Sequence, residues 1–354
     1  MMSIFTHLLA LSGLLALLLL YKLWRNNHQN NSNKGKSAPE PSGARPLVGH
    51  LHLLGGQVPL YRIFGGLADE YGPVFGLRVG LHKVLVVSSW EAVKDCLTTN
   101  DKILAKRPAS RAAVYLGFAN TSFGFTDGPY WREMRKLGLQ GLLSARRLET
   151  LKHVRESEID TAIRELYKEH PGKVVDIGEW FVQVTSNMLM MMLAGKRYTN
   201  STETVEVRSV REHIKELINL FGQFTVADAF PFPPLSWIDF HGHLKSMKRI
   251  KKGLSTIFER WIDEHVRRDC QSDEQDFIDV MLLTVDDERF MRFGHTRETI
   301  IKATLTSLII GGNDTTSIHM TWLLSLLLNN RRVLQRAQEE IDAKCLVLKL
   351  EMAL

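Results

Sequence analysis

Cysteine is scarce in this chain, which has three among its 354 residues. The three lie far apart and form no C-x-x-C pair, so a disulfide framework is excluded and free thiols suit a reducing compartment. The thirteen histidines form neither an H-x-x-H nor an H-E-x-x-H pair. A histidine-built metal site is therefore not supported, and we predict no metal-ligating side chain.

Charge is absent from the first stretch, because residues 1–21 carry no formally charged side chain. Of the net charge of +6, residues 22–45 contribute +4, since five basic residues stand there against one acid. The rest of the chain is close to balanced, which gives no sign of nucleic-acid binding. A basic segment beside an apolar run indicates a membrane surface instead.

An apolar run extends from Ile4 to Tyr21, about 18 residues, which is the short end of a bilayer-spanning length. Basic residues follow the run, and no small-x-small cleavage site ends it, so a cleaved signal peptide is disfavoured. We predict an uncleaved signal-anchor transmembrane helix over 1–24. The alternative, a buried helix of a soluble core, fits poorly because the run has no polar face.

The basic flank should remain on the cytoplasmic side of the bilayer. This predicts a single-pass protein of the endoplasmic reticulum membrane, with the lipid bilayer as a partner and the body facing the cytosol. Residues 25–46 form a basic polar linker and then a proline-rich strut. Pro39, Pro41 and Pro46 favour extended backbone at and before each proline, which predicts a stiff segment. The alternative is an ordinary linker.

The body of the chain, residues 47–344, is predicted to be mainly α with a small β part. Two β-rich runs within 73–89 break near Gly80, which predicts a hairpin. Asp314 and His319 would be costly in lipid, so the apolar stretch around them is predicted to be a core helix rather than a second membrane span. The predicted helices cover 61–72, 90–100, 130–143, 144–170, 176–194, 205–222, 242–268, 274–285, 297–329 and 331–344.

The sequence GGNDTT interrupts the most apolar of these helices. One interpretation is punctuation, in which a helix ends at glycine and a polar residue caps a second helix. The other is close approach, in which Gly311 and Gly312 let a flat group lie against an unbroken helix. In that case Asp314 and Thr315 face the group, and a carboxylate beside a hydroxyl is a proton-delivery pair.

A second motif is W-x-x-x-R, formed by Trp131 and Arg135 after Gly128-Pro129. Residues four apart share one face of a helix. The indole N–H and the guanidinium can both donate to a carboxylate or a phosphate. The alternative is a Trp–Arg stack on a helix surface.

Together, the anchor, basic flank, proline strut, W-x-x-x-R and G-G-x-D-T-T occur in an order that resembles a cytochrome P450. These are haem-thiolate monooxygenases, and the likeness is to the microsomal plant type of specialised metabolism. It is also carried by "RPLVGHLHLLGG", "FGFTDGPYWREMRKL" and "ADAFPFPPLSWIDF", and it extends to about residue 344.

The resemblance implies a cytochrome P450 fold, haem as cofactor and roles for six residues. Trp131 and Arg135 would hold a haem propionate. Gly311 and Gly312 would let the long helix pass over the haem. Asp314 and Thr315 would deliver protons during dioxygen activation. The segment 111–126 would help to shape the substrate pocket.

The thiolate that holds the family's iron is missing from this chain. Its signature is F-x-x-G-x-R-x-C-x-G, and neither Cys96 nor Cys345 has any of its flanking residues, while Cys270 has only the arginine. The resemblance therefore implies a C-terminally truncated chain that ends just after the long central helix, with 345–354 as an aberrant tail. Apolar faces within 274–344 are then expected to be open to water.

Two hypotheses for function follow. The first is a membrane-anchored monooxygenase that oxidises a lipophilic plant secondary metabolite, with electrons from an NADPH-dependent reductase, although this chain lacks the thiolate and is expected to be inactive. The second is a non-catalytic membrane-anchored fragment, either a pseudogene or a splice product that pairs with full-length enzymes.

Overall fold

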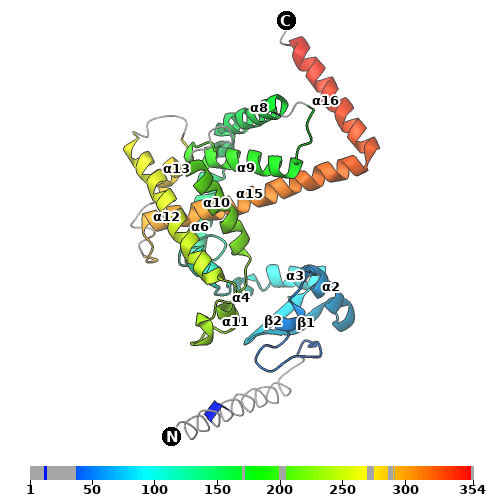
Figure 1. The fold of residues 1–354 in the computed structure, drawn as a ribbon, viewed down its shortest axis with the longest axis vertical. Coiled ribbons are helices and arrows are strands. Elements are labelled where there is room, and N and C mark those ends of the chain that lie inside the picture. The colour runs from blue at the N-terminus through cyan, green and yellow to red at the C-terminus, as the bar shows by residue number, and fades with distance from the viewer. Residues whose placement is uncertain are drawn as a thin grey trace. The chain divides into compact units, whose positions relative to one another are not determined.

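The computed structural model describes residues 12–13, 37–169, 172–198, 205–268, 275–285, 290 and 292–351 (Figure 1). Nearly all of the expected anchor over 1–24 lies outside the described residues, as does the linker up to residue 36. Within the described ranges, no helix combines the length and the hydropathy needed to cross a bilayer.

The chain divides into two compact units. The first comprises Met1–Lys106 and Phe224–Asp239, and the second comprises Arg107–Gln223 and Phe240–Leu354. Both units are built mainly from helices, and the described strands form one two-stranded sheet in the first unit. The predicted mainly helical fold with a small β part is confirmed.

The hairpin of the first unit joins β1 (Val74–Val79) and β2 (His82–Val87) in antiparallel register, with Val79 opposite His82. Phe75 and Leu77 alternate along β1 toward the buried side, as the period of a half-buried strand requires. Gly80 makes the turn at a φ of +60°, and a Cβ there would lie 2.7 Å from the carbonyl oxygen of Ala229. A side chain at Gly80 would therefore be both strained and blocked.

The proline-rich strut is bonded to this hairpin. The backbone N–H of Gly76 donates to the carbonyl of Pro39 over 2.8 Å, and Arg78 pairs with Glu40 at 2.7 Å. The buried His50 links both segments, since its Nδ1 accepts from the Arg78 N–H at 3.0 Å and its Nε2 donates to the Pro41 carbonyl at 2.9 Å. These bonds fix the strut against β1. Among the described residues of this unit, the helices are η1 (Leu51–Leu53), α2 (Leu60–Tyr71), α3 (Trp90–Leu97), α4 (Asp101–Leu104), α11 (Val226–Ala229) and η4 (Leu235–Trp237).

The second unit is entirely helical in its described part. Its elements are α5 (Arg111–Tyr115), α6 (Gly128–Lys136), the π-helix η2 (Leu137–Leu142), α7 (Ala145–Thr150), α8 (Lys152–Glu169), α9 (Ile177–Ala194), α10 (Val205–Phe221), α12 (His243–Arg267), α13 (Phe277–Thr284), α15 (Arg297–Asn329) and α16 (Arg331–Glu351). α15 packs against α9, α10 and α12, which makes it the central helix of the unit.

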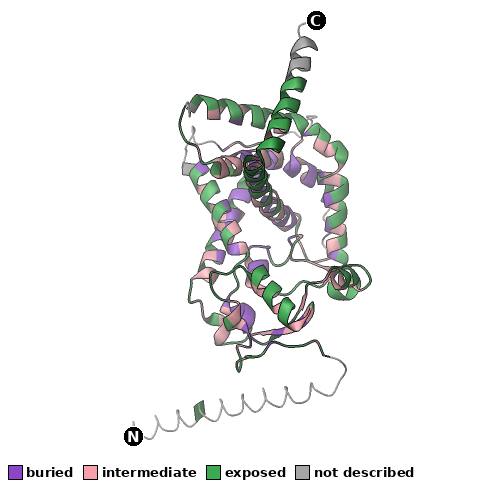
Figure 2. Cartoon of the chain, turned by 90° about the vertical axis from the view of Figure 1, so that its right-hand side faces the viewer, coloured by how far each residue is buried: buried purple, intermediate pink, exposed green. Residues whose placement is uncertain are grey.

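The core of the second unit gathers around the first half of α15. Ile300, Ile301, Leu305 and Ile309 are all 0% exposed and pack with buried side chains of α9, α12 and α13. Beyond Ile309, the buried residues of α15 are Asn313 and Ser317. Figure 2 shows the same change of burial, and it colours most of α16 as exposed. The expected exposure of apolar faces late in the chain is therefore present in this part of the molecule.

Most predicted helices are confirmed, with two internal differences. The helix predicted over 130–143 changes from α to π geometry after Lys136. The helix predicted over 144–170 breaks at Leu151. Just before the break, the Thr150 hydroxyl donates to the backbone carbonyls of Arg146 and Arg147 at 3.1 and 3.0 Å. A side chain that bonds the preceding turn in this way competes with the helical ladder. Three short helices, α4, α5 and α11, were not predicted.

Candidate functional site

The central helix α15 runs without a break through GGNDTT. It begins after Thr296, whose side chain accepts from the Thr299 N–H, and it continues to Asn329. The Thr315 hydroxyl donates to the Gly311 carbonyl at 2.6 Å, and the Ser317 hydroxyl donates to the Asn313 carbonyl at 3.1 Å. The interpretation of the glycines as punctuation between two helices is therefore wrong. The presence of two glycines inside one helix has to be explained by what packs against it.

Gly312 and Asn313 belong to the packed side of α15, which faces α9. A Cβ at Gly312 would lie 3.3 Å from a methyl group of Leu189, so the missing side chain permits close packing of the two helices. Asn313 is 4% exposed, and its side-chain oxygen Oδ1 accepts from the hydroxyls of Ser186 at 2.6 Å and Thr185 at 3.4 Å. These bonds satisfy a buried amide that would otherwise be costly.

Gly311 and Thr315 lie on the open side of the same helix. A Cβ at Gly311 would meet no atom within 4 Å, and both residues are exposed. Ile318 and Trp322 follow at helical spacing and are 48% and 65% exposed. The result is a smooth strip of backbone at Gly311, flanked by one hydroxyl and continued by apolar side chains. A flat, mainly apolar group fits this strip, and the haem implied by the resemblance is such a group.

Asp314 does not share the open side with its neighbour Thr315. It lines a cavity of about 540 Å³ between α9, α10 and α15. Glu179 of α9 and Arg211 and Lys215 of α10 line the same cavity. The two members of the predicted proton-delivery pair therefore face different surroundings: Asp314 lies beside a polar cavity with charges of both signs, and Thr315 lies on the exposed strip.

Trp131 and Arg135 lie together on α6. The helix begins with Gly128 at a φ of +67° and with Pro129 in its first turn, a favourable helix start. The Arg135 guanidinium carbon lies 5.2 Å from the centre of the Trp131 ring, so the two side chains stack. Arg135 is exposed, and its guanidinium carries five N–H donors. No hydrogen bond or ion pair joins either residue to α15 within the described ranges.

A loop between α5 and α6 is fastened to α15 close to this strip. The hydroxyls of Ser122 and Ser307 are 2.5 Å apart, and the Phe123 N–H donates to Ser307 at 3.2 Å. The Tyr130 hydroxyl donates to the Thr121 carbonyl at 3.1 Å. Burial raises the pKa of Tyr130, so its phenol stays a proton donor over the ordinary pH range. These bonds hold the segment that the resemblance assigns to the substrate pocket.

The same loop has an unusual backbone. Phe118, Ala119 and Asn120 have consecutive positive φ values of 49°, 59° and 64°. Only glycine and, less readily, asparagine adopt this region at low cost, so two of the three residues are strained. Strain of this kind persists where surrounding contacts impose it, and it often marks a functional segment. Sequence reasoning missed this feature, since neither Phe118 nor Ala119 favours such a turn.

Two further groups bear on ligand binding. His265, Asp276 and Asp279 have side-chain atoms within 4.8 Å of one another, but these atoms bond to each other and to backbone at the start of α13. Their arrangement is explained by helix capping. Cys96 is a free, half-buried cysteine of the first unit. Cys270 and the side chain of Cys345 lie outside the described residues.

Comparison with known proteins gives consistent matches. The sequence profile described as cytochrome P450 matches residues 39–345. A nicotine N-demethylase of Nicotiana tomentosiformis is 41% identical over 338 residues, which are 92% of this chain and 65% of that protein. A xanthotoxin 5-hydroxylase of Arabidopsis thaliana is 44% identical over 326 residues, which are 87% of this chain and 62% of that protein. The chain thus spans less than two thirds of the length of these relatives.

A solved structure supports the fold. A zebra fish cytochrome P450 with progesterone superposes with a TM-score of 0.63 at 21% sequence identity. The match covers 81% of this chain and 64% of that one. At this identity, the likeness concerns the arrangement of helices and not the ligand.

Proposed function

This chain belongs to the cytochrome P450 family, of the plant type, and from that premise we propose that it carries part of a haem-dependent monooxygenase site. Haem is the cofactor of this family, and when bound it supplies the activation of dioxygen. The proposal is carried by one observation, the open strip of α15 at Gly311 and Thr315.

The residues that would hold the cofactor lie on two helices. Gly311 offers backbone without a side chain, so a planar ring system can approach α15 closely. On α6, the Arg135 guanidinium and the Trp131 indole N–H are donors suited to the carboxylates of haem. Their stack keeps the guanidinium in place before any ligand arrives, which lowers the entropic cost of binding.

Thr315 and Asp314 would divide the handling of protons between them. The Thr315 hydroxyl donates to the Gly311 carbonyl at 2.6 Å, which leaves its oxygen lone pairs directed outward as acceptors. Rotation about its side-chain bond would turn the hydroxyl proton toward the strip. Asp314, beside the polar cavity, would exchange protons with water there. Because Asp314 and Thr315 face different surroundings, a proton from Asp314 would reach Thr315 only through intervening water molecules.

The substrate class is proposed from the relatives and from the loop that carries the strained turn. The relatives are named for demethylation of nicotine and for hydroxylation of xanthotoxin. We propose a lipophilic plant secondary metabolite, oxidised by hydroxylation or a related reaction. The loop held to Ser307 would border it, and shape of the pocket would decide specificity.

Membrane attachment and the electron donor are also proposals. The apolar run from Ile4 to Tyr21 and its basic flank support a single-pass anchor in the endoplasmic reticulum membrane, with the body in the cytosol. An NADPH-dependent reductase in the same membrane would supply electrons. The bonds between the proline-rich strut and β1 make the strut part of the first unit.

The 354-residue chain would not complete the reaction by itself. None of its three cysteines has the flanking residues of the iron-binding signature, and the thiolate is what favours O–O cleavage in this family. The second candidate function is therefore a non-catalytic, membrane-anchored protein that pairs with full-length enzymes. The absence of a fitting cysteine favours it.

Haem titration of the purified chain tests the proposed site. We expect saturable haem uptake by the wild type and its loss in Gly311→Leu, because the added side chain fills the strip. Thr316→Leu adds similar bulk at an exposed position turned about 140° around the helix and should leave uptake unchanged. Equal uptake by both variants would contradict a site at Gly311, and absence of uptake in the wild type would favour the non-catalytic alternative.

A further inference from the structure

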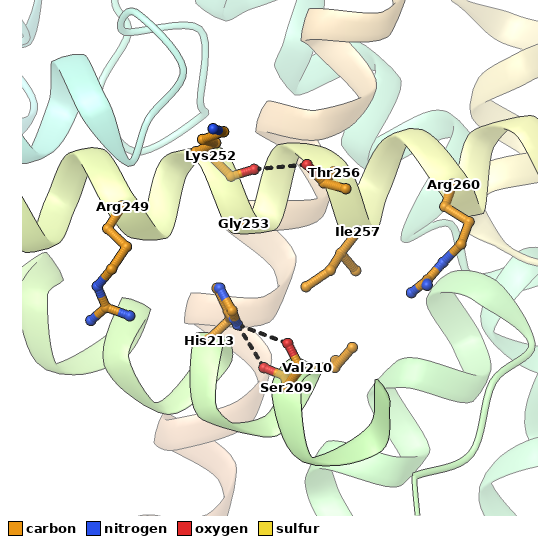
Figure 3. A pocket seen from close by; sticks show the side chains of 9 residues that line it. All are labelled: Ser209, Val210, His213, Arg249, Lys252, Gly253, Thr256, Ile257 and Arg260. Atoms are coloured by element: carbon orange, nitrogen blue, oxygen red, sulfur yellow. Dashed lines mark hydrogen bonds between the residues drawn. The ribbon is translucent and has the colours of Figure 1, made fainter. Parts of the chain in front are cut away.

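A groove of about 750 Å³ lies between α10 and α12, away from the open strip of α15 (Figure 3). Its volume is in the range of small-molecule sites. Its lining comes from both helices: Ser209, Val210, His213, Arg249, Lys252, Gly253, Thr256, Ile257 and Arg260. None of these residues has a role in the proposed oxygenase site.

The floor of the groove is apolar and closely packed. His213 of α10 lies directly against Gly253 of α12, where a Cβ would come within 2.0 Å of the ring. Its Nδ1 donates to the Ser209 carbonyl at 2.7 Å, which fixes the ring orientation (Figure 3). Val210 and Ile257 are buried next to this contact, on its Arg260 side (Figure 3). The floor therefore offers a rigid apolar surface.

The rim of the groove is basic. Arg249, Lys252 and Arg260 all come from α12, and no acidic residue is among the lining residues. Arg249 is ion-paired with Glu216 of α10, so its charge is partly balanced. The Lys252 ammonium takes part in no ion pair with the described residues. Figure 3 shows Arg249 and Lys252 leaving α12 in different directions, so an anion that contacts both would draw the flexible Lys252 side chain toward Arg249. The excess positive charge of these two residues is about one unit.

We propose that this groove binds an amphipathic anion, with its phosphate or carboxylate head beside Arg249 and Lys252. The apolar body would lie over Gly253 and Ile257 toward Arg260. Arg260 follows Lys252 by eight positions on α12, so the groove is about 12 Å long at helical rise, which suits a medium alkyl chain. An arginine fork recognises carboxylate or phosphate oxygens, and the lysine adds a compact charge.

The test measures binding of decyl phosphate to the full chain in a neutral detergent by equilibrium dialysis, with inorganic phosphate and decyltrimethylammonium as comparison ligands. We expect saturable binding of decyl phosphate alone. Lys252→Gln should weaken it about tenfold, the loss of one charge-assisted contact. Lys252→Arg should restore it.

Two further variants locate the site. Thr256→Trp fills the groove from an exposed position and should abolish binding. Lys248→Gln removes the same charge from α12, but Lys248 lies over the Tyr115 ring, away from the groove, and its loss should change nothing. Urea midpoints verify that each variant is folded.

Several outcomes would overturn the proposal. Equal weakening by Lys248→Gln and Lys252→Gln would indicate general charge attraction. Binding that survives Thr256→Trp would place the ligand elsewhere. Equal affinity for inorganic phosphate would show that the apolar floor does not contribute to binding. Equal affinity for the cationic amphiphile would show that the basic residues do not contribute, and absence of saturable binding would contradict the site as a whole.

Discussion

At the scale of single residues, His265 has an acceptor on each ring nitrogen. Its Nδ1 lies 2.6 Å from the Trp261 carbonyl and its Nε2 lies 2.7 Å from a carboxylate oxygen of Asp276. Both nitrogens must carry a proton to make both bonds, so the imidazole is cationic. Burial lowers the pKa of His265, but the hydrogen bond and charge of Asp276 outweigh it and the net direction is upward.

This assignment predicts how stability depends on pH. A histidine whose pKa is raised in the folded state contributes stability below its unfolded pKa, and the contribution is lost as pH rises through the folded value. From about pH 6.5 upward, the free energy of unfolding of the wild type should fall as pH rises. That of His265→Gln should not show this fall, because glutamine has no proton to lose. Urea unfolding across this range measures the difference between the two curves. A constant difference would contradict a cationic His265.

The two central glycines are predicted to respond differently to alanine. Gly311→Ala should raise the free energy of unfolding by about 1 kcal/mol, because helix propensity improves and the Cβ meets no atom within 4 Å. Gly312→Ala should gain less or lose stability, because its Cβ would press on Leu189 at 3.3 Å. Denaturant unfolding of the haem-free chain compares them. An equal gain at both positions would show that α9 does not constrain Gly312.

At the scale of elements, α15 has two differently built sides. Asn313 and Ser317 are buried, and Asn313 is bonded to Ser186 of α9, whereas Gly311 and Thr315 are open. The motif GGNDTT thus combines a helix-packing signal with a ligand-facing one. Close packing on α9 and an open ligand-facing side each require small or polar residues in the centre of an apolar helix. For this reason the sequence GGNDTT resembles the end of one helix and the start of another.

The packed side predicts a stability effect separate from haem binding. Asn313→Ala should lower the free energy of unfolding by about 1–3 kcal/mol, because it leaves the Ser186 hydroxyl without its acceptor at a buried interface. Thr315→Ala, two residues later in the same motif and on the open side of the helix, should have little effect. Thermal or urea unfolding distinguishes them, and equal destabilisation would contradict the division of the helix into two sides.

Sequence patterns were sufficient to predict the long helices and the hairpin, because the local capping and turn signals agree with the pattern of burial. Asp176 and Ser144 cap α9 and α7 through their side chains, and Gly195 ends α9 at a φ of +61°. The break at Leu151 and the π-helix at Leu137–Leu142 were not predictable. Both depend on local bonding that leaves the apolar period nearly unchanged.

For the candidate site, sequence spacing predicted only which side chains are neighbours along one helix. Spacing alone placed Trp131 beside Arg135, and the stack was one of two stated alternatives. Spacing could not tell that Gly311 is open while Gly312 meets Leu189, because the position of α9 is a tertiary fact. Nor could it place Asp314 beside a cavity with Arg211 and Lys215.

At the scale of the whole molecule, the described chain leaves a large apolar stripe in contact with water. Ile318, Trp322 and Leu326 continue the open side of α15 and are 48%, 65% and 56% exposed. Contiguous apolar surface of this kind promotes association. It also continues the strip on which the proposed cofactor would lie.

The stripe predicts a gain in solubility on substitution. Trp322→Gln combined with Leu326→Gln should lower self-association of the detergent-solubilised chain and reduce binding of an apolar dye. Tyr167→Gln, at an aromatic residue 88% exposed on α8, is the matched control and should have little effect. Sedimentation velocity measures the association. An unchanged sedimentation profile in the double variant would show that the apolar stripe does not mediate self-association.

The central claim is that this 354-residue chain presents a haem-binding strip on α15 but holds no thiolate for the iron. The reduced carbon monoxide difference spectrum of the haem-loaded wild type tests it most directly, with Gly311→Leu as the variant that should not load. The account predicts haem uptake without the Soret band of a thiolate-ligated iron. A band at the thiolate position would contradict it, and would mean that one of Cys96, Cys270 or Cys345 binds the iron.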